Sequence, residues 1–141
     1  MTTSALPQNR NRWLAAVGYG LLAEISTIVT IVLIVTVYKY GIARGLSDAA
    51  YAAFSDKTGG AVGVVGGTLF TYLYSRILMR RLTTNFVAHG IVVALVAIVL
   101  SVMGSIAGHG TVPAAYILAS ILKLIAGWFA GFQTRKPAHL T

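Results

Sequence analysis

Two residues of opposite charge stand inside long apolar stretches of this sequence, where charged side chains are rare. Glu24 lies near the centre of the stretch 13–38, and Lys123 lies in the middle of the stretch 113–132. A charge at membrane depth is costly unless it is protonated, paired or hydrated. Because both residues fall at similar depth, a single contact between them would neutralise both charges.

This intramembrane pair has two interpretations, and the sequence leaves both open. In the first, the pair is a proton- or ion-responsive centre, in which Glu24 exchanges protons or binds a cation and Lys123 sets its affinity. In the second, it is a static ion pair that fixes which helices meet.

By helical periodicity, each of the two charged residues shares a helix face with mainly small and hydroxyl-bearing residues. The face around Glu24 carries Gly20, Thr27 and Ile31, and the face around Lys123 carries Tyr116, Ser120, Gly127 and Gly131. Such faces are typical of helices packed on protein or water rather than on lipid. We therefore expect Thr27, Ser120 and Tyr116 to line the centre, with His89 as a further candidate.

No residue pattern predicts an enzyme, a metal site or a cofactor. The chain has no cysteine, which excludes thiolate ligands and cysteine nucleophiles. His89 and His109 are 20 residues apart, about 30 Å along a helix, so they cannot share a site. We expect His89 to be a satisfied polar residue beside Asn85. Paired carboxylates, an H-E-x-x-H motif and a serine elbow are all missing from the sequence.

Composition predicts an integral membrane protein. Of 141 residues, 57% are hydrophobic and 10% are charged, whereas soluble domains carry about 25% charged residues. Runs of about 20 apolar residues can span the hydrocarbon core as helices. We predict an all-α four-helix bundle that forms one membrane domain over residues 1–141, with spans at about 13–38, 59–78, 86–108 and 113–132.

The segment 41–58 is too short and too polar to cross a membrane. Ser47 is a suitable N-cap for a short helix that begins at Asp48. Tyr51 and Phe54 would share one face of that helix, which suits a position on the membrane surface. The sequence thus predicts an interfacial helix between the first two spans.

Glycines are spaced so that helices can approach closely. Gly59, Gly63 and Gly67 recur at intervals of four in the second span, and Gly127 and Gly131 do so in the fourth. Small residues at this spacing form flat helix-packing surfaces in membranes. We expect these glycines to pack helices within the chain or to dock a partner.

Two function classes follow. We favour a structural or assembly subunit of a membrane complex, or a homo-oligomer; the alternative is a small proton- or ion-coupled transporter or channel that uses Glu24 and Lys123. The net charge of +8 does not indicate nucleic acid, because the basic residues sit at the ends of apolar runs. There they orient the helices and attract anionic headgroups of the lipid bilayer.

The distribution of lysine and arginine yields a topology prediction. Seven basic residues flank the spans on one side (Arg10, Arg12, Arg76, Arg80, Arg81, Arg135 and Lys136), and three do so on the other (Lys39, Arg44 and Lys57). Both termini should therefore be cytoplasmic, in a cell inner membrane. Reporter tags fused at Met1 and Thr141 should both report the cytoplasm. Opposite locations for the two tags would mean an odd number of spans.

Overall fold

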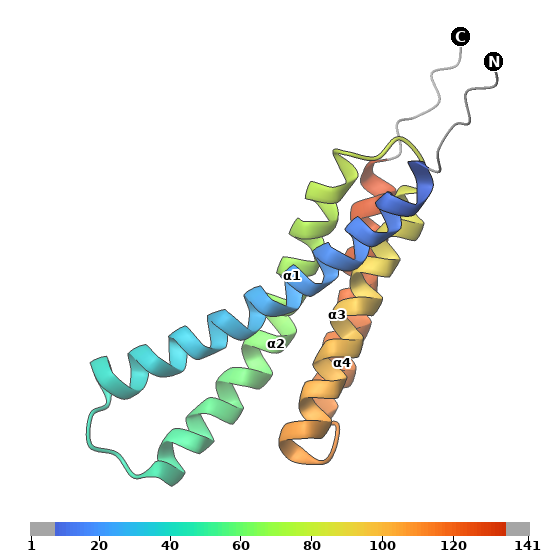
Figure 1. The fold of residues 1–141 in the computed structure, drawn as a ribbon. Helices are drawn as coiled ribbons and strands as arrows, with labels where there is room; N and C mark the ends of the chain where they lie inside the picture. The colour runs from blue at the N-terminus through green and yellow to red at the C-terminus, as the bar shows by residue number, and fades with distance from the viewer. Residues whose placement is uncertain (1–7, 135–141) are drawn as a thin grey trace, which may run out of the picture.

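The computed structural model describes residues 8–134 and contains four long helices joined by short connections (Figure 1). They are α1 (Gln8–Val37), which continues into a π-helical turn η1 (Tyr38–Ile42), α2 (Asp48–Met79), α3 (Phe86–His109) and α4 (Ala114–Thr134). Each of the four is long and apolar enough to cross a membrane. The prediction of an all-α bundle with four candidate membrane spans is confirmed, and these spans indicate a multi-pass membrane protein.

The separate interfacial helix is the part of the fold prediction that the structure does not contain. Its residues form the first turns of α2, which runs without a break from Asp48 to Met79. Ser47 does cap this helix as expected, because its side chain accepts a hydrogen bond from the amide of Ala50. A helix of 32 residues is about 48 Å long and exceeds the thickness of the hydrocarbon core.

The aromatic face of these first turns packs on the end of the preceding helix. The ring of Phe54 stacks on that of Tyr38 at a centroid distance of 3.6 Å. The hydroxyl of Tyr51 donates a hydrogen bond to the carbonyl of Ala43. The amphipathic pattern predicted that Tyr51 and Phe54 would contact a membrane surface. In the structure both side chains contact residues of this chain instead.

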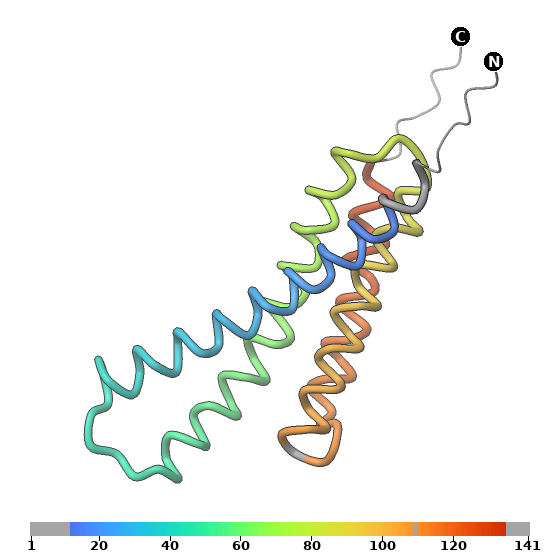
Figure 2. The backbone as a smooth tube through the Cα atoms, viewed as in Figure 1, coloured from blue at the N-terminus to red at the C-terminus, as the bar shows by residue number. Residues whose placement is uncertain are grey.

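The helices run alternately up and down, so the bundle has two distinct ends. At the terminal end α1 begins, α4 ends and α2 is joined to α3; at the opposite end lie the α1–α2 and α3–α4 connections (Figure 1). The hairpin of α1 and α2 diverges from that of α3 and α4 towards the opposite end (Figure 2). Packing must therefore differ between the two halves of the bundle.

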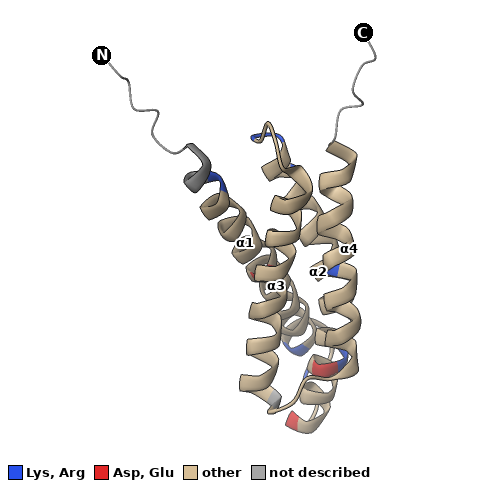
Figure 3. Cartoon of the chain, turned by 90° about the vertical axis from the view of Figure 1, so that its right-hand side faces the viewer, with Lys and Arg blue, Asp and Glu red and all other residues tan. Residues whose placement is uncertain are grey.

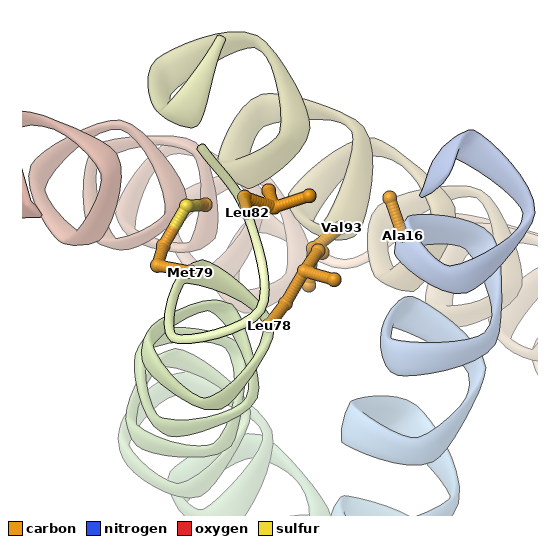
Figure 4. Packing of buried hydrophobic residues seen from close by; sticks show 5 residues of the cluster. All are labelled: Ala16, Leu78, Met79, Leu82 and Val93. Atoms are coloured by element: carbon orange, nitrogen blue, oxygen red, sulfur yellow. The ribbon is translucent and has the colours of Figure 1, made fainter. Parts of the chain in front are cut away.

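A buried apolar cluster closes the half near the terminal end. Ala16 of α1, Leu78 and Met79 of α2, Leu82 of the α2–α3 connection and Val93 of α3 form it (Figure 4). Each of these five residues is at most 8% exposed. Three helices and a loop are thereby fixed to one another at this end.

Glycines allow the closest helix contacts in the same half. A Cβ atom added to Gly90 of α3 would lie 2.1 Å from the carbonyl oxygen of Gly127 of α4. One added to Gly131 would lie 2.6 Å from the Cα atom of Val87. Of the glycines named from the sequence, Gly127 and Gly131 thus pack helices within the chain, because only a hydrogen atom fits between the backbones.

Gly59 and Gly63 of α2, which were also expected to pack a helix, make no such contact within the described chain. A Cβ atom at either position would meet no atom within 4 Å, so no other helix among residues 8–134 packs on them. They lie where the two hairpins diverge and leave open space between the helices.

Charged residues gather at the two ends of the bundle, and the middle is almost free of them (Figure 3). The arginines Arg12, Arg76, Arg80 and Arg81 belong to the terminal end, and Lys39, Arg44 and Lys57 to the opposite end. Arg135 and Lys136, which also entered the charge count, lie outside the described residues, as does the side chain of Arg10.

The glycine contact between α3 and α4 yields a prediction. Gly90→Ala should destabilise the protein by about 1–3 kcal/mol, because its methyl group would overpack the helix crossing. Gly104→Ala on the same helix is the control, since a Cβ atom there meets nothing within 4 Å. Thermal unfolding in detergent measures both. Equal melting temperatures for the two variants would mean that α3 and α4 do not cross at Gly90.

Candidate functional site

The two intramembrane charges form an ion pair in the middle of the bundle. The Nζ atom of Lys123 lies 2.7 Å from Oε2 of Glu24. The two residues are 1% and 6% exposed, respectively. The contact expected between them is present, and it holds a neutral pair where a single charge would be strongly unfavourable.

Ser101 of α3 completes the arrangement, which we call the polar centre (Glu24, Ser101 and Lys123). The ammonium group of Lys123 donates a second hydrogen bond to Oγ of Ser101, at 2.6 Å. That hydroxyl in turn donates to Oε1 of Glu24, also at 2.6 Å. Both carboxylate oxygens are thus satisfied, and hydrogen bonds of this kind to charged groups are short and strong.

Sequence reasoning missed Ser101. Many hydroxyl groups in these helices bond to the carbonyl four residues earlier, as Thr27 and Thr71 do, and nothing local marks Ser101 as different. A comparison of depth would have found it. Both α1 and α3 begin at the terminal end, and Glu24 and Ser101 lie 16 and 15 residues after their first residues.

The lysine reaches the carboxylate across the diagonal of the bundle. Both α1 and α4 pack on α2 and on α3, so they lie diagonally opposite one another. Lys123 crosses beside Gly67 of α2, where an added Cβ atom would lie 2.7 Å from its Cε. All four helices therefore meet at this level. Of the three glycines predicted at intervals of four in the second span, Gly67 is the one that contacts other helices of the chain.

A cavity of about 230 Å³ lies between the four helices and extends to Glu24 and Ser101. Thr27 and Tyr116, which were expected to line the centre, are part of its wall. So are Gly59 and Gly63, whose missing side chains help to leave it open. A space of this size with several polar groups in its wall can hold several water molecules.

A second cavity, of about 510 Å³, continues towards the opposite end. It shares Gly60, Ala115 and Tyr116 with the first cavity, so the two adjoin. Asp56 and Thr111 lie in its wall, near the α1–α2 and α3–α4 connections. The described residues thus form two adjoining cavities, one near the connections at the opposite end and one that has Glu24 in its wall.

On its other side the polar centre adjoins closely packed helices. Lys123 is absent from the walls of both cavities, and the Gly90–Gly127 contact lies one helical turn beyond it along α4. The apolar cluster around Leu78 follows nearer to the terminal end. The two cavities therefore lie on the side of the polar centre that faces the opposite end.

Two of the polar residues named from the sequence do not line this centre. Ser120 donates its hydroxyl to the carbonyl of Tyr116 on its own helix and lies outside both cavity walls. His89 lies in the first turn of α3 near the terminal end, stacked on Trp13 at 4.0 Å between ring centroids. Its Nδ1 lies 2.9 Å from the carbonyl oxygen of Asn85, the neighbour expected from the sequence. Its buried Nε2 has no hydrogen-bond partner among the described residues, so the expectation that His89 is fully satisfied is wrong.

Among the side chains that the structure describes, no three histidine or acidic residues come together as a metal site would require. The comparisons with known proteins give no assignment either. No protein-family model, curated protein or solved structure matches this chain significantly. Any functional conclusion must therefore come from the polar centre and the two adjoining cavities.

The ion pair can be tested by a double-mutant cycle. Glu24→Gln and Lys123→Met should each destabilise the protein by about 3–5 kcal/mol, because each leaves its partner as an uncompensated buried charge. The double variant should recover much of this loss, since neither charge then remains. Unfolding in detergent gives the four free energies. Additive losses would contradict the pairing.

Proposed function

We propose that this protein is a small membrane transporter for protons or small cations, with the polar centre as its binding site. The observation that supports this best is the cavity that has Glu24 and Ser101, two residues of the polar centre, in its wall. An ion pair needed only to join helices requires no such cavity. Intramembrane ionisable residues that face water commonly mark ion or proton pathways.

The charge of the cavity walls favours cations over anions. Glu24 and Asp56 lie in the cavity walls and account for two of the three acidic residues of the chain. No lysine or arginine lies in either wall. A cation that enters would meet the negative charge of Asp56 first and farther in the carboxylate of Glu24, whose charge the ammonium group of Lys123 balances.

The position of the cavities on one side favours a carrier over an open channel. A carrier exposes its binding site to one side of the membrane at a time. The cavities lie on the side of the polar centre that faces the opposite end, whereas packed glycines and apolar side chains lie on its other side. These features correspond to one of the two states that such a cycle needs.

The charge asymmetry orients these cavities. We infer that the terminal end, with its larger number of basic residues, faces the cytoplasm of a cell bounded by an inner membrane. The cavities then open to the outside. The first turns of α2, with Asp48 and Asp56 exposed, would lie at the outer surface of this inner membrane. This is the interfacial position that the sequence predicts for the segment 41–58.

A role as a structural or assembly subunit, or as a homo-oligomer, is the second candidate. The mutual neutralisation of Glu24 and Lys123 supports it, because a satisfied pair can be purely architectural. In this role Gly59 and Gly63 would dock a helix of a partner or of a second copy. The two candidates differ in whether water reaches the polar centre.

Cysteine accessibility tests for that water, and the absence of native cysteine makes the experiment specific. A membrane-impermeant thiol reagent should modify Gly63→Cys at least about tenfold faster than Val65→Cys, because only a hydrated thiol ionises and reacts. Val65 is the matched control, being 70% exposed on the same helix but outside both cavity walls. Equal slow rates would indicate a dry or occupied cavity and favour the assembly role.

Transport itself is tested in proteoliposomes that contain the purified full-length protein. With a gradient of Na⁺ or K⁺ and a trapped pH dye, wild-type protein should catalyse cation or proton flux. The Glu24→Gln/Lys123→Met double variant should reduce this flux to the rate of protein-free vesicles, whereas Asp48→Asn should retain it. Asp48 is a matched acid-to-amide control, since it is exposed and lies outside both walls. Flux by the double variant at the wild-type rate would contradict the proposal.

A further inference from the structure

An apolar groove of about 490 Å³ runs between α2 and α4 on the outside of the bundle. Leu69 of α2 and Ile125 and Phe129 of α4 are among the residues that line it, and all three are exposed. The hydroxyl of Thr68, which also lies in the wall, donates to the carbonyl of Val64 on its own helix. The groove therefore suits a hydrocarbon chain.

Polar side chains close the terminal end of this groove. The hydroxyl of Tyr72, which lies in the wall, donates to Oε1 of Gln133 at 2.7 Å. One helical turn farther along α2, Nη1 of Arg76 donates to Oγ1 of Thr134 at 3.1 Å. Both hydrogen bonds join α2 to α4 near the ends of these helices. The contact between the two helices thus changes from apolar to cationic within one turn.

Arg76 has no acidic side chain with which to pair. The chain has three acids: Glu24 belongs to the polar centre, and Asp48 and Asp56 lie in the first turns of α2, at the opposite end. Within the described part of the chain, the bond to Thr134 is the one side-chain hydrogen bond of Arg76. The other N–H donors of its guanidinium group suit a phosphate, which arginine can bind through two parallel hydrogen bonds.

We propose that an anionic phospholipid binds here, with an acyl chain in the groove and its phosphate at Arg76. Along α2, the 12 residues from Val64 to Arg76 span about 18 Å, close to the depth of one leaflet with its headgroup region. The terminal end is the one inferred to face the cytoplasm, whose leaflet carries anionic lipids. This lipid site lies outside both cavities and does not depend on cation transport.

A second copy of the chain could also cover an apolar groove, but its charge disfavours it. Copies that follow the same charge rule insert in the same orientation, so their terminal ends lie on the same side of the membrane. A helix of a second copy in the groove would bring its own arginines to the level of Arg76, Arg80 and Arg81. Like charges repel one another, whereas a lipid phosphate brings the opposite charge.

The headgroup, and not the acyl chain, must determine which lipid binds. Lipid tails are as apolar as leucine side chains, so an acyl chain gains little when it moves from the bilayer into the groove. A zwitterionic lipid can therefore fill the groove as well. The guanidinium group of Arg76 should favour an anionic lipid over a zwitterionic one about fivefold, the usual effect of one arginine near an anionic surface.

Quenching of tryptophan fluorescence by brominated acyl chains tests this preference. Full-length protein is reconstituted into phosphatidylcholine vesicles that contain a small fraction of brominated phosphatidylglycerol or, in parallel, of brominated phosphatidylcholine. Leu69→Trp reports on the groove, and Leu95→Trp on α3 is the matched control, both combined with Trp13→Phe and Trp128→Phe. The two leucines are 52% and 46% exposed and lie 10 and 9 residues from the terminal ends of their helices.

The expected result is a preference at one reporter only. At Leu69→Trp, the association constant of phosphatidylglycerol should exceed that of phosphatidylcholine about fivefold. At Leu95→Trp, the two constants should be equal, because this side chain lies outside the groove.

Two further variants assign the preference to Arg76. Arg76→Gln should abolish the preference at Leu69→Trp, because the amide is neutral. Arg12→Gln removes an equal charge at the same end, but from α1, which lies diagonally opposite α4 and there bonds to Thr83. It should leave the preference intact, since salt screens charges beyond about 10 Å.

Wild-type protein, which needs no reporter, gives an independent measurement. Native mass spectrometry in detergent with equimolar amounts of the two lipids should show phosphatidylglycerol bound in about fivefold excess over phosphatidylcholine. Equal binding of the two lipids in either experiment, or an undiminished preference in folded Arg76→Gln, would overturn the inference. Weak quenching of Leu69→Trp by both brominated lipids would also overturn it, because protein would then cover the groove.

Discussion

The rest of the structure depends on the burial of one ammonium group in the middle of four apolar helices. An unpaired lysine charge at that depth would be strongly unfavourable, so each of the other helices provides what Lys123 needs. The first helix supplies the carboxylate of Glu24, the third supplies the hydroxyl of Ser101, and the second supplies the space beside Gly67. The positions of all four helices at this level are therefore coupled through a single side chain.

The packing of the helices differs on the two sides of the polar centre. Towards the terminal end, glycine contacts such as Gly90–Gly127 and the apolar cluster around Leu78 pack the described helices closely. Towards the opposite end the hairpins diverge and leave the two adjoining cavities, one of which has Glu24 in its wall. Nothing in the need to pair two charges calls for this asymmetry, which is why we favour a role in transport over a purely architectural one.

Much of this arrangement could be predicted from the sequence, for identifiable physical reasons. Glu24 and Lys123 could be paired because they are the two charges inside apolar stretches and each needs the other. Ser101 could not be singled out locally, since a hydroxyl in a helix normally bonds to its own backbone. The glycines were ambiguous for a related reason: a missing side chain permits either close packing, as at Gly127, or open space, as at Gly63. An aromatic face such as that of Phe54 suits lipid and a neighbouring helix equally well. The sequence could not predict that Phe54 stacks on Tyr38 at the end of α1.

The central claim is that the ammonium group of Lys123 contacts the carboxylate of Glu24 inside the bilayer. Glu24 is the only glutamate in the chain, so ¹³Cδ-glutamate and ¹⁵Nζ-lysine labelling allows one unambiguous measurement by solid-state NMR in lipid. The account predicts a strong dipolar coupling between the two labels, as a 2.7 Å contact from Nζ to Oε2 requires, and loss of this coupling in Lys123→Met. A wild-type protein without such a coupling would contradict the account.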